Sequence, residues 1–488
     1  MNSRLISNKH LAAANLAGLA LRIFFIAHRP FHSGDTHFYE ELARNWLDHG
    51  VYGLFINGQL LPVDMRMPGY PAFLAAIYAV LGRTRTAVLL VQAVLDLITC
   101  YVVAMIAGRL APGAKRAVVA TAALWLAALC PFTAGYTAAV LTEALATFLT
   151  ALAFYALLQA VTDPSIELAG SDARGTTLLP FVEWVLLAGV LTGLGTLVRP
   201  ETPLLLAAAG LVFCIRWRHP ADWPKLALAG TWMALGLLLP LLPWAVRNAR
   251  TLGRTEFLAP RYAESRGDFI PRGFYSWTGT WMVRPRDAYF VPWKLGKEPI
   301  RAETLPSSAY DSESERARVE MLLSRYNYDL KMSPVLDHDF ADLARERTAR
   351  RPWRTLLFIP LARAAALWFT PHIELLPYSG ELWPPGDRWR SNRIDFGVTL
   401  ALGILNIILI GLVLRGAWRC GSKSGLALTI AFIGVRTVFF TQRLTIEPRY
   451  MIICIPIVLA MAAQAWAVAQ PDVSKVKRAS LLLSDEVT

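Results

Sequence analysis

Acidic and basic side chains recur where the apolar runs of this sequence end. Asp35 follows the first run, within the stretch FHSGDTHFYEELARNWLDHGVY, and Glu143 follows Pro131 at the start of a later run. Three further run ends carry the motifs VRPETP, PWAVRNART and TIEPRYM. A charged side chain costs roughly 2.5–3.5 kcal/mol at the centre of a membrane helix and less near its edge. Because this cost recurs at several run ends, the sequence predicts that these charged residues form a shared polar site.

Carboxylates and arginines together suit the transfer of a group from a lipid-linked phosphate. A carboxylate can deprotonate or orient an acceptor hydroxyl, and arginines can stabilise the departing phosphate, bidentately where the geometry permits. The predicted catalytic residues are Asp35, as the general base, and Glu143, as its support. The predicted substrate and phosphate contacts are Arg449, Arg247, Arg199, Tyr39, Arg66, Glu201, Glu447 and Tyr450.

Each of these residues also has a structural interpretation. Asp35 could be a solvated loop residue, and Glu143 and Glu201 could cap helix N-termini, where a carboxylate satisfies free N–H groups and the helix dipole. Arg247 and Arg449 could extend from a helix end to the membrane interface.

Two further groups of polar residues need an interpretation. Asp96 lies near the middle of an apolar run, one turn after Gln92. We interpret it as a hydrogen-bonded contact between helices, because it lies too deep for a site at the membrane face. Four histidines, at 28, 32, 37 and 49, could bind a divalent metal with Asp35, but their spacing matches no tight metal motif. No cofactor is therefore predicted beyond this one alternative near Asp35.

The composition places these residues in a membrane protein. Of the 488 residues, 55% are hydrophobic and 17% charged, and the mean hydropathy is +0.39. Globular domains carry about 25% charged residues. The net charge of +13 fits basic cytoplasmic loops and anionic lipids or substrates better than a nucleic-acid partner. The five cysteines lie in apolar runs or a basic loop, so no disulfide framework is expected.

Hydropathy predicts an all-α polytopic protein with about 10–12 transmembrane helices. The apolar runs are 11–27, 86–108, 117–131, 137–161, 180–198, 202–216, 226–247, 396–415, 424–440 and 450–468. Two more candidates, 69–82 and 354–371, are short or interrupted by Pro360 and Arg363. We expect these two to be juxtamembrane or re-entrant helices.

The basic connections predict the orientation. Segments 108–116, 216–225, 415–425 and 475–478 are rich in Lys and Arg, so the positive-inside rule places them in the cytoplasm. Both termini are then expected in the cytoplasm, and the first run is expected to be an uncleaved anchor. The candidate site residues at the run ends lie together at the extracytoplasmic face.

This orientation divides the chain into four parts. An N-terminal transmembrane module (1–247) contains the predicted catalytic first outer loop (28–85). An extracytoplasmic insert (248–353) with amphipathic helices near 311–330 and 337–350 follows. The C-terminal transmembrane helices (354–470) and a cytoplasmic tail (471–488) complete the chain.

Several motifs resemble one known superfamily along most of the chain. The stretch SGDTHFYEELARNWLDHGVYG, followed by RMPGYPAFLAAIYAVLG, resembles the first outer loop of the GT-C glycosyltransferases. The supporting motifs are LTEAL at 141–145, LVRPET at 197–202, PWAVRN at 243–248 and EPRYMIICIPIVLA at 447–460. The most similar group is that of the dolichyl-phosphate-mannose protein mannosyltransferases, including bacterial lipid A aminoarabinose transferases.

The resemblance implies the GT-C fold and an inverting transfer of a hexosyl or pentosyl group from a polyprenyl-phosphate donor. Asp35 matches the catalytic acid of the first loop, Glu143 a second acid facing the site, and Arg449 a phosphate contact. Thr36 follows Asp35 where eukaryotic protein mannosyltransferases have glutamate, and segment 248–353 does not resemble their β-trefoil domain. A lipid or polysaccharide acceptor therefore fits at least as well as a protein.

Two other functions remain open from the sequence. A polysaccharide polymerase or ligase would use a polyprenyl-diphosphate donor and rely on arginine and histidine in the long insert. A lipid or glycan transporter would show repeat symmetry and helices broken at the midplane, and the sequence has no such repeat.

Overall fold

The computed structural model describes residues 5–163, 179–253, 258–259, 269–443 and 446–467. Within them, eight helices are long and apolar enough to cross a membrane, or nine if one bent pair counts as a span. The eight are Asn8–His28 (α1), Arg85–Leu110 (α4), Glu143–Val161 (α7), Leu179–Val198 (α9), Pro220–Leu252 (with α11, Trp223–Leu252), Arg393–Arg419 (α18), Lys423–Thr441 (α19) and Pro448–Trp466 (with α20, Ile455–Ala462). The prediction of an all-α, multi-pass membrane protein is confirmed.

The number of spanning helices is lower than the predicted ten to twelve, although all ten apolar runs are helical. Run 117–131 contains α5 (Arg116–Ala128), which is bent by 44° against Pro131–Ala138, the segment of α6 (Pro131–Ala134) and a following 3₁₀ turn. Proline lacks an N–H donor and disfavours helical backbone at the preceding residue, and Cys130 is accordingly extended. Run 202–216 contains only the 13-residue α10 (Leu204–Arg216).

The two ends of the bundle carry different connections. At one end, Arg109 Nε donates to Thr162 Oγ1 at 2.9 Å and the Gly421 N–H donates to the Leu110 carbonyl at 3.0 Å. The basic connections 108–116, 216–225 and 415–425 lie at this end, where Arg216 also donates to the Val161 carbonyl, and the candidate site residues lie at the opposite end. The basic segment 475–478 and the predicted tail 471–488 lie outside the described residues. Which of the two ends faces the cytoplasm stays a prediction.

The two shorter candidate segments are not among the helices of spanning length. Residues 69–82 form α3 (Gly69–Leu81), which lies on α9 so closely that a Cβ at Gly69 would be 2.7 Å from the Leu197 carbonyl. Residues 354–371 form a π-helical turn and α16 (Ile359–Trp368). Asn406, in the middle of α18, donates to the Trp368 carbonyl at 2.6 Å, so α16 reaches inward from the site end before the chain turns back.

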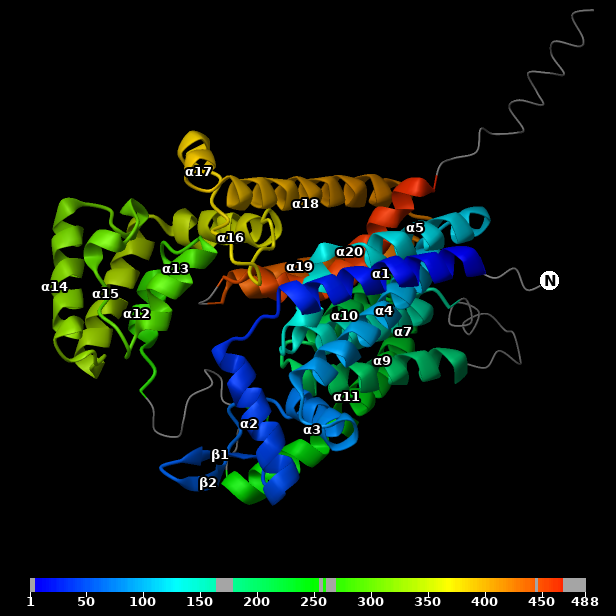
Figure 1. The fold of residues 1–488 in the computed structure, drawn as a ribbon, viewed down its shortest axis with the longest axis horizontal. Coiled ribbons are helices and arrows are strands. Elements are labelled where there is room, and N and C mark those ends of the chain that lie inside the picture. The colour runs from blue at the N-terminus through cyan, green and yellow to red at the C-terminus, as the bar shows by residue number, and fades with distance from the viewer. Residues whose placement is uncertain (1–4, 164–178, 254–257, 260–268, 444–445, 468–488) are drawn as a thin grey trace, which may run out of the picture.

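Residues 28–85, the predicted first outer loop, contain a β-hairpin that the sequence analysis does not predict. It lies between α2 (Gly34–His49) and α3, and pairs β1 (Gly53–Ile56) with β2 (Gln59–Pro62) (Figure 1). The two-residue turn, Asn57-Gly58, has positive φ at both positions, which is the preference of a type I′ turn.

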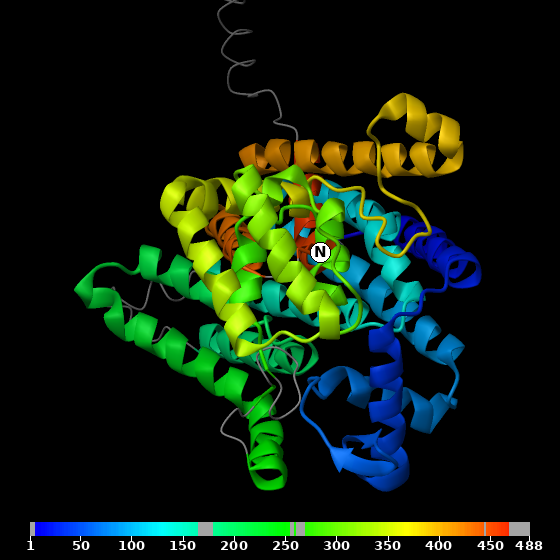
Figure 2. The same ribbon diagram turned by 90° about the vertical axis from the view of Figure 1, so that its left-hand side faces the viewer.

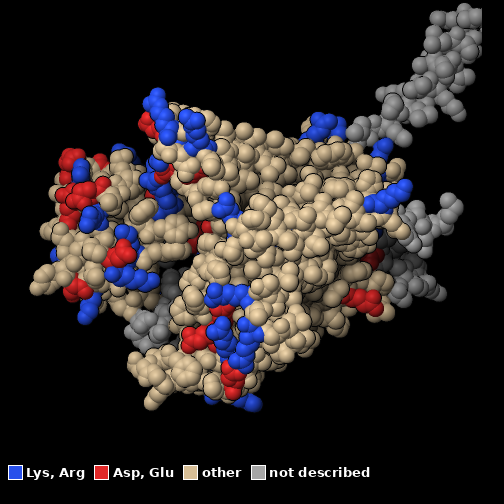
Figure 3. All heavy atoms as spheres, in the orientation of Figure 1, with Lys and Arg blue, Asp and Glu red and all other residues tan. Residues whose placement is uncertain are grey.

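The predicted insert is a separate group of helices at the site end of the bundle, on the left in Figure 1. In Figure 2 this group faces the viewer. It comprises α12 (Arg272–Gly279), α13 (Pro285–Phe290), α14 (Glu313–Asp329) and α15 (Pro334–Arg350). Its own apolar core includes Phe274, Trp277 and Phe340, whose rings pack within 6 Å of one another. Figure 3 shows that charged side chains gather over the insert and α2, whereas the surface over α1 and α5 is largely uncharged.

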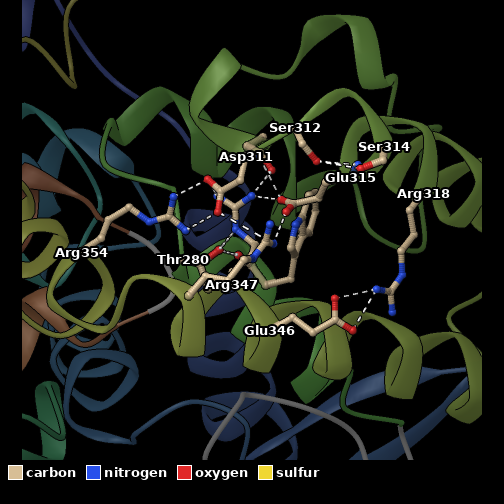
Figure 4. Close-up of polar contacts among 12 residues, drawn as sticks. Thr280, Asp311, Ser312, Ser314, Glu315, Arg318, Glu346, Arg347 and Arg354 are labelled. Atoms are coloured by element: carbon tan, nitrogen blue, oxygen red, sulfur yellow. Dashed lines mark hydrogen bonds and ion pairs between the residues drawn. The ribbon is translucent and has the colours of Figure 1, made fainter.

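A buried ionic network holds the insert together (Figure 4). Arg347 is fully buried and forms ion pairs with Glu315 and, at 3.7 Å, with Asp311. Asp311 also pairs with Arg354, the first residue of the π-helical turn. The network therefore connects α14 and α15 to the segment that enters the bundle.

Candidate active site

Asp35 lies in the first turn of α2, with a half-buried side chain. Its Oδ1 accepts a hydrogen bond from Arg66 Nη2 at 2.9 Å, and its Oδ2 lies 3.9 Å from Arg449 Nη1. The neighbouring Thr36 is fully buried, and its hydroxyl donates to the Val140 carbonyl at 3.2 Å. Thr36 thus anchors the start of α2.

Arg449 comes from the turn that begins the last membrane helix. It forms an ion pair with Glu447, and its guanidinium carbon lies 5.6 Å from the Tyr450 ring centroid. Burial raises the pKa of Glu447, although Arg449 opposes this effect. Arg449 is thereby held between two carboxylates, Glu447 and Asp35.

Glu143 begins α7 and belongs to a second line of ion pairs. Its Oε1 accepts from Arg199 Nη1 at 3.0 Å, and Arg199 Nε donates to Glu201 Oε1 at 2.8 Å. Arg436, from α19, approaches the same Glu201 oxygen at 3.5 Å and donates twice to the Tyr450 carbonyl. These groups are largely buried. A direct partner of Glu143 is Arg199, the centre of this second line of ion pairs.

Tyr450 joins the two lines of charge. The guanidinium carbons of Arg199 and Arg449 lie 5.5 and 5.6 Å from its ring centroid, and its hydroxyl donates to Glu447 Oε1 at 3.3 Å. The resulting cluster contains four carboxylates and four guanidinium groups, namely Asp35, Glu143, Glu201, Glu447, Arg66, Arg199, Arg436 and Arg449. The structure therefore brings together, from distant segments, most of the predicted site residues.

Two predicted contacts are not part of these ion pairs. Tyr39 lies one turn after Asp35 on α2, packs edge to face on Tyr70 with ring centroids 5.1 Å apart, and lines a cavity together with Arg66. Arg247 donates to the carbonyls of Tyr52 and Val63 at 2.7 and 2.8 Å, on either side of the hairpin. Arg247 therefore holds the hairpin against α11, a role that differs from the predicted phosphate contact.

The divalent metal considered near Asp35 stays a prediction. Among the residues that the structure describes, no three His, Cys, Asp or Glu side chains are grouped so as to hold one. The four histidines considered above are exposed, and the two guanidinium groups beside Asp35 disfavour a cation there.

A cavity of about 1480 Å³ opens beside Arg66, the hydrogen-bond partner of Asp35. Arg66 and Tyr39 line it on the side of the first loop, and α12, α15, α16 and the end of α19 form the other walls. The cavity lies between the insert and the bundle, and it is large enough for a substrate head group.

The pKa of Glu201 gives a testable stability effect. Burial by itself raises this pKa, but Arg199 and Arg436 outweigh it and lower the pKa to about 2 from 4.5. A depressed carboxyl pKa stabilises the fold above pH 4.5, and this contribution is lost as the pH falls towards 2. Glu201→Gln should therefore lower the free energy of unfolding at pH 7 by about 3 kcal/mol.

Thermal unfolding of wild type and Glu201→Gln in detergent, from pH 7 to pH 3, checks this expectation. The difference between the two proteins should shrink as the pH falls. A difference that stays constant across this range would contradict the assignment of the stabilisation to the Glu201 carboxylate.

Two arginines of the structure were not among the predicted residues. Arg436 completes the Glu201 pairing, and Arg22 pairs with Asp96 at 2.6 Å inside the bundle. Arg22 also donates to the Gly18 and Ala128 carbonyls. The interpretation of Asp96 as a hydrogen-bonded helix contact is confirmed. Both arginines interrupt apolar runs, and that interruption was the signal available in the sequence.

Residues 65–172 match the sequence model of the family described as dolichyl-phosphate-mannose-protein mannosyltransferase. This stretch includes Arg66 and Glu143 but not Asp35, Arg199 or Arg449. No curated protein sequence matches the chain.

Solved structures of similar fold cover nearly all of the chain. The Archaeoglobus fulgidus oligosaccharyltransferase tethered to an acceptor peptide is 13% identical, with a TM-score of 0.50, over 94% of this chain and 49% of that one. The same archaeal enzyme, AglB, with an inhibitory peptide and a dolichol-phosphate, is 13% identical, with a TM-score of 0.48, over 94% and 49%. ArnT from Cupriavidus metallidurans is 14% identical, with a TM-score of 0.40, over 93% and 76%.

This chain spans about half the length of the oligosaccharyltransferase. At these identities the likeness concerns the fold alone. The predicted GT-C fold and the resemblance to this superfamily are confirmed at that level.

Proposed function

We propose that this chain is a membrane glycosyltransferase that moves a hexosyl or pentosyl group from a polyprenyl-phosphate donor to an acceptor hydroxyl. The observation that carries the proposal is the position of Asp35 between Arg66 and Arg449, at the end of the bundle where the outer loops meet. The match of residues 65–172 to a family of dolichyl-phosphate-mannose-dependent transferases supports the donor class.

Asp35 acts as the general base in this reaction. Its carboxylate takes the proton of the acceptor hydroxyl while the hydroxyl oxygen forms a bond to the anomeric carbon of the sugar. The bond from that carbon to the phosphate oxygen breaks, and polyprenyl phosphate leaves with the electron pair. The acceptor attacks the face opposite the leaving group, so the configuration inverts.

Arg449 stabilises the negative charge that develops on the departing phosphate. Its Nη1 lies 3.9 Å from Asp35 Oδ2, and its side chain is partly exposed. Arg449 can therefore contact both the base and the leaving phosphate. Glu143, Arg199, Glu201 and Arg436 are positioning residues, because they hold Tyr450 and the start of the last membrane helix.

The expected effect of Arg449→Gln is a loss of transfer rate on the order of 10², since one charged contact to the leaving group is removed. Single-turnover measurements of product formation with saturating donor isolate this step. Arg390→Gln, at an exposed arginine of α17 (Pro385–Ser391), is the matched control and should retain the wild-type rate. Equal rates for wild type and Arg449→Gln would remove Arg449 from the leaving-group site.

The cellular setting follows from the predicted orientation. The reaction would take place at the extracytoplasmic face of a bacterial inner membrane, with both termini in the cytoplasm. The acceptor would be a lipid, a polysaccharide or a protein of the cell envelope.

Product formation by the purified protein tests the proposal. The protein in detergent is offered a panel of polyprenyl-phosphate sugars with membrane-lipid acceptors, and products are identified by mass spectrometry. Transfer from a polyprenyl-diphosphate sugar alone would favour the polymerase or ligase instead. Movement of the lipid between leaflets of a vesicle without any product would favour the transporter.

A further inference from the structure

The connection from α16 to α17 lies across the site end of the bundle. Arg29, which stands between α1 and Asp35, donates from Nη2 to the Tyr378 hydroxyl at 3.4 Å. Earlier in the same connection, the ring of His372 packs on the ring of Phe132 in α6, with centroids 5.0 Å apart. The connection is therefore held between α6 and the chain that leads from α1 to Asp35.

His372 and Glu374, in this connection, carry polar atoms without a partner. The side chain of His372 is 1% exposed and that of Glu374 is 16% exposed. Among the described residues, no group forms a hydrogen bond with either ring nitrogen of His372, with either carboxylate oxygen of Glu374, or with the buried hydroxyl of Tyr136. Polar groups buried in this state are costly, so the three side chains suit a polar ligand.

Glu374 lies within electrostatic reach of Arg449. Burial raises the pKa of the Tyr289 hydroxyl, on α13, to about 12. The carboxylates of Glu447 and Glu374 add to this rise in the pKa, and Arg449 opposes it. The hydroxyl of Tyr136 likewise interacts with the charges of both Glu374 and Arg449. Glu374 therefore stands near the guanidinium group to which we assign the leaving phosphate.

The charge of Glu374 selects the kind of group that it can bind. The carboxylates of the cluster around Asp35 pair with arginines, whereas Glu374 pairs with no arginine or lysine in the described part of the chain. A carboxylate without a cation repels a phosphate, but it accepts strong hydrogen bonds from hydroxyl groups. In a sugar phosphate bound at Arg449, the group next to the phosphate that carries hydroxyls is the sugar ring.

We propose that Glu374 binds hydroxyl groups of the donor sugar and that His372 positions this carboxylate. The inference rests on the proposed function, because the phosphate at Arg449 brings the sugar to Glu374. His372 Nδ1 lies 3.6 Å from Glu374 Oε1, so the imidazole can hold this oxygen while Oε2 accepts from the sugar. The Tyr136 hydroxyl, in the 3₁₀ turn after α6, offers a further hydrogen bond. Glu374 thereby contributes to the choice of sugar.

Binding of short-chain donor analogues to the purified full-length protein tests this assignment without requiring turnover. The probes are citronellyl phosphate and the phosphodiesters that it forms with mannose, glucose, galactose and arabinose, titrated by calorimetry in a neutral detergent. We expect at least one glycosylated probe to bind more tightly than citronellyl phosphate. Glu374→Gln should lower this ratio of affinities about tenfold, because a hydrogen bond to a charged group is lost.

Deoxy forms of the preferred sugar separate a direct contact from an effect on folding. In wild type, at least one deoxy form should bind about tenfold more weakly than the parent sugar, because it leaves the carboxylate without its hydroxyl partner. In Glu374→Gln, the parent sugar and this deoxy form should bind nearly alike. If every deoxy form loses as much affinity in Glu374→Gln as in wild type, Glu374 does not touch the sugar.

A matched variant controls for the loss of a carboxylate from this connection. Glu381 pairs with Arg286 and Arg388, and Glu381→Gln should keep the wild-type ratio of affinities. An equal fall in this ratio for Glu374→Gln and Glu381→Gln would overturn the assignment. It would also be overturned if no glycosylated probe bound more tightly than citronellyl phosphate.

Two substitutions of His372 test its positioning role. His372→Ala should lower the ratio of affinities, because the group beside Glu374 Oε1 is removed. His372→Asn should keep most of the ratio, since asparagine tolerates the left-handed backbone at this position (φ 51°) and places an N–H donor close to the position of Nδ1. A wild-type ratio in His372→Ala would remove His372 from the site.

The two proposals can fail separately. If glycosylated probes gain affinity through Glu374 but no sugar is transferred from any polyprenyl phosphate, the proposed function fails alone. If sugar is transferred but the ratio of affinities is the same in wild type and Glu374→Gln, the assignment of Glu374 fails alone.

Discussion

Replacing Asp35 with asparagine is expected to lower the rate of sugar transfer by about 10²–10⁴, the usual contribution of a general base. Asparagine has nearly the same shape and can still accept a hydrogen bond from Arg66, but it cannot take the acceptor proton. The loss should therefore appear in kcat rather than in the apparent affinity for the donor. Rates measured with saturating donor and acceptor check this.

The controls for Asp35→Asn separate catalysis from folding. Asp48→Asn lies on the same helix, where Asp48 is exposed and paired with Arg83, and should keep the wild-type rate. Asp35 is itself partly exposed, so its ion pair contributes only about 0–1 kcal/mol to stability. An Asp35→Asn protein that is stable and nearly fully active would move the base elsewhere in the cluster.

Replacing Arg347 with methionine is expected to lower the free energy of unfolding of the insert by about 3–5 kcal/mol. Arg347 is fully buried, and besides its ion pairs it donates to Thr280 Oγ1 and to the Ala309 and Ser308 carbonyls, each at 2.9 Å. Methionine fills part of the space but leaves these acceptors without a donor. The remaining pairs of Glu315 with Arg350 and of Asp311 with Arg354 place the effect at the lower end of the range.

Hydrogen exchange of the purified protein localises this effect. Exchange should accelerate throughout α14 and α15, and little elsewhere in the membrane bundle. Arg318→Met removes an exposed pair with Glu346 on the same two helices and should change exchange only slightly. If both variants accelerate exchange equally, the buried network is not what holds the insert together.

Helix positions followed from the sequence because they depend on local hydropathy. The interactions within the site did not, because each joins distant segments. Asp35 and Arg66 are 31 residues apart, Glu143 and Arg199 are 56 apart, and Arg436 reaches Glu201 across 235 residues. A motif such as TIEPRYM shows that charges stand at a helix end, but not which partner each charge meets.

Arg247 illustrates the same limit. Its motif, PWAVRN, gives it the same position at a helix end as the other arginines, yet it binds backbone carbonyls on both sides of the hairpin. That role depends on the hairpin itself, whose Asn57-Gly58 turn is a local signal that the hydropathy analysis passed over. The arginines that line the cavity are equally non-local, because they come from the first loop, the insert, α16 and the end of α19.

The pairing of Arg22 with Asp96 bears on how the protein enters the membrane during synthesis. Arg22 precedes its counter-charge by 74 residues, so it is synthesised well before Asp96. An unpaired arginine within a helix opposes insertion by roughly 2.5–3.5 kcal/mol, so α1 by itself is a weak anchor. We therefore expect α1 to gain its full stability in the membrane only once α4 has supplied Asp96.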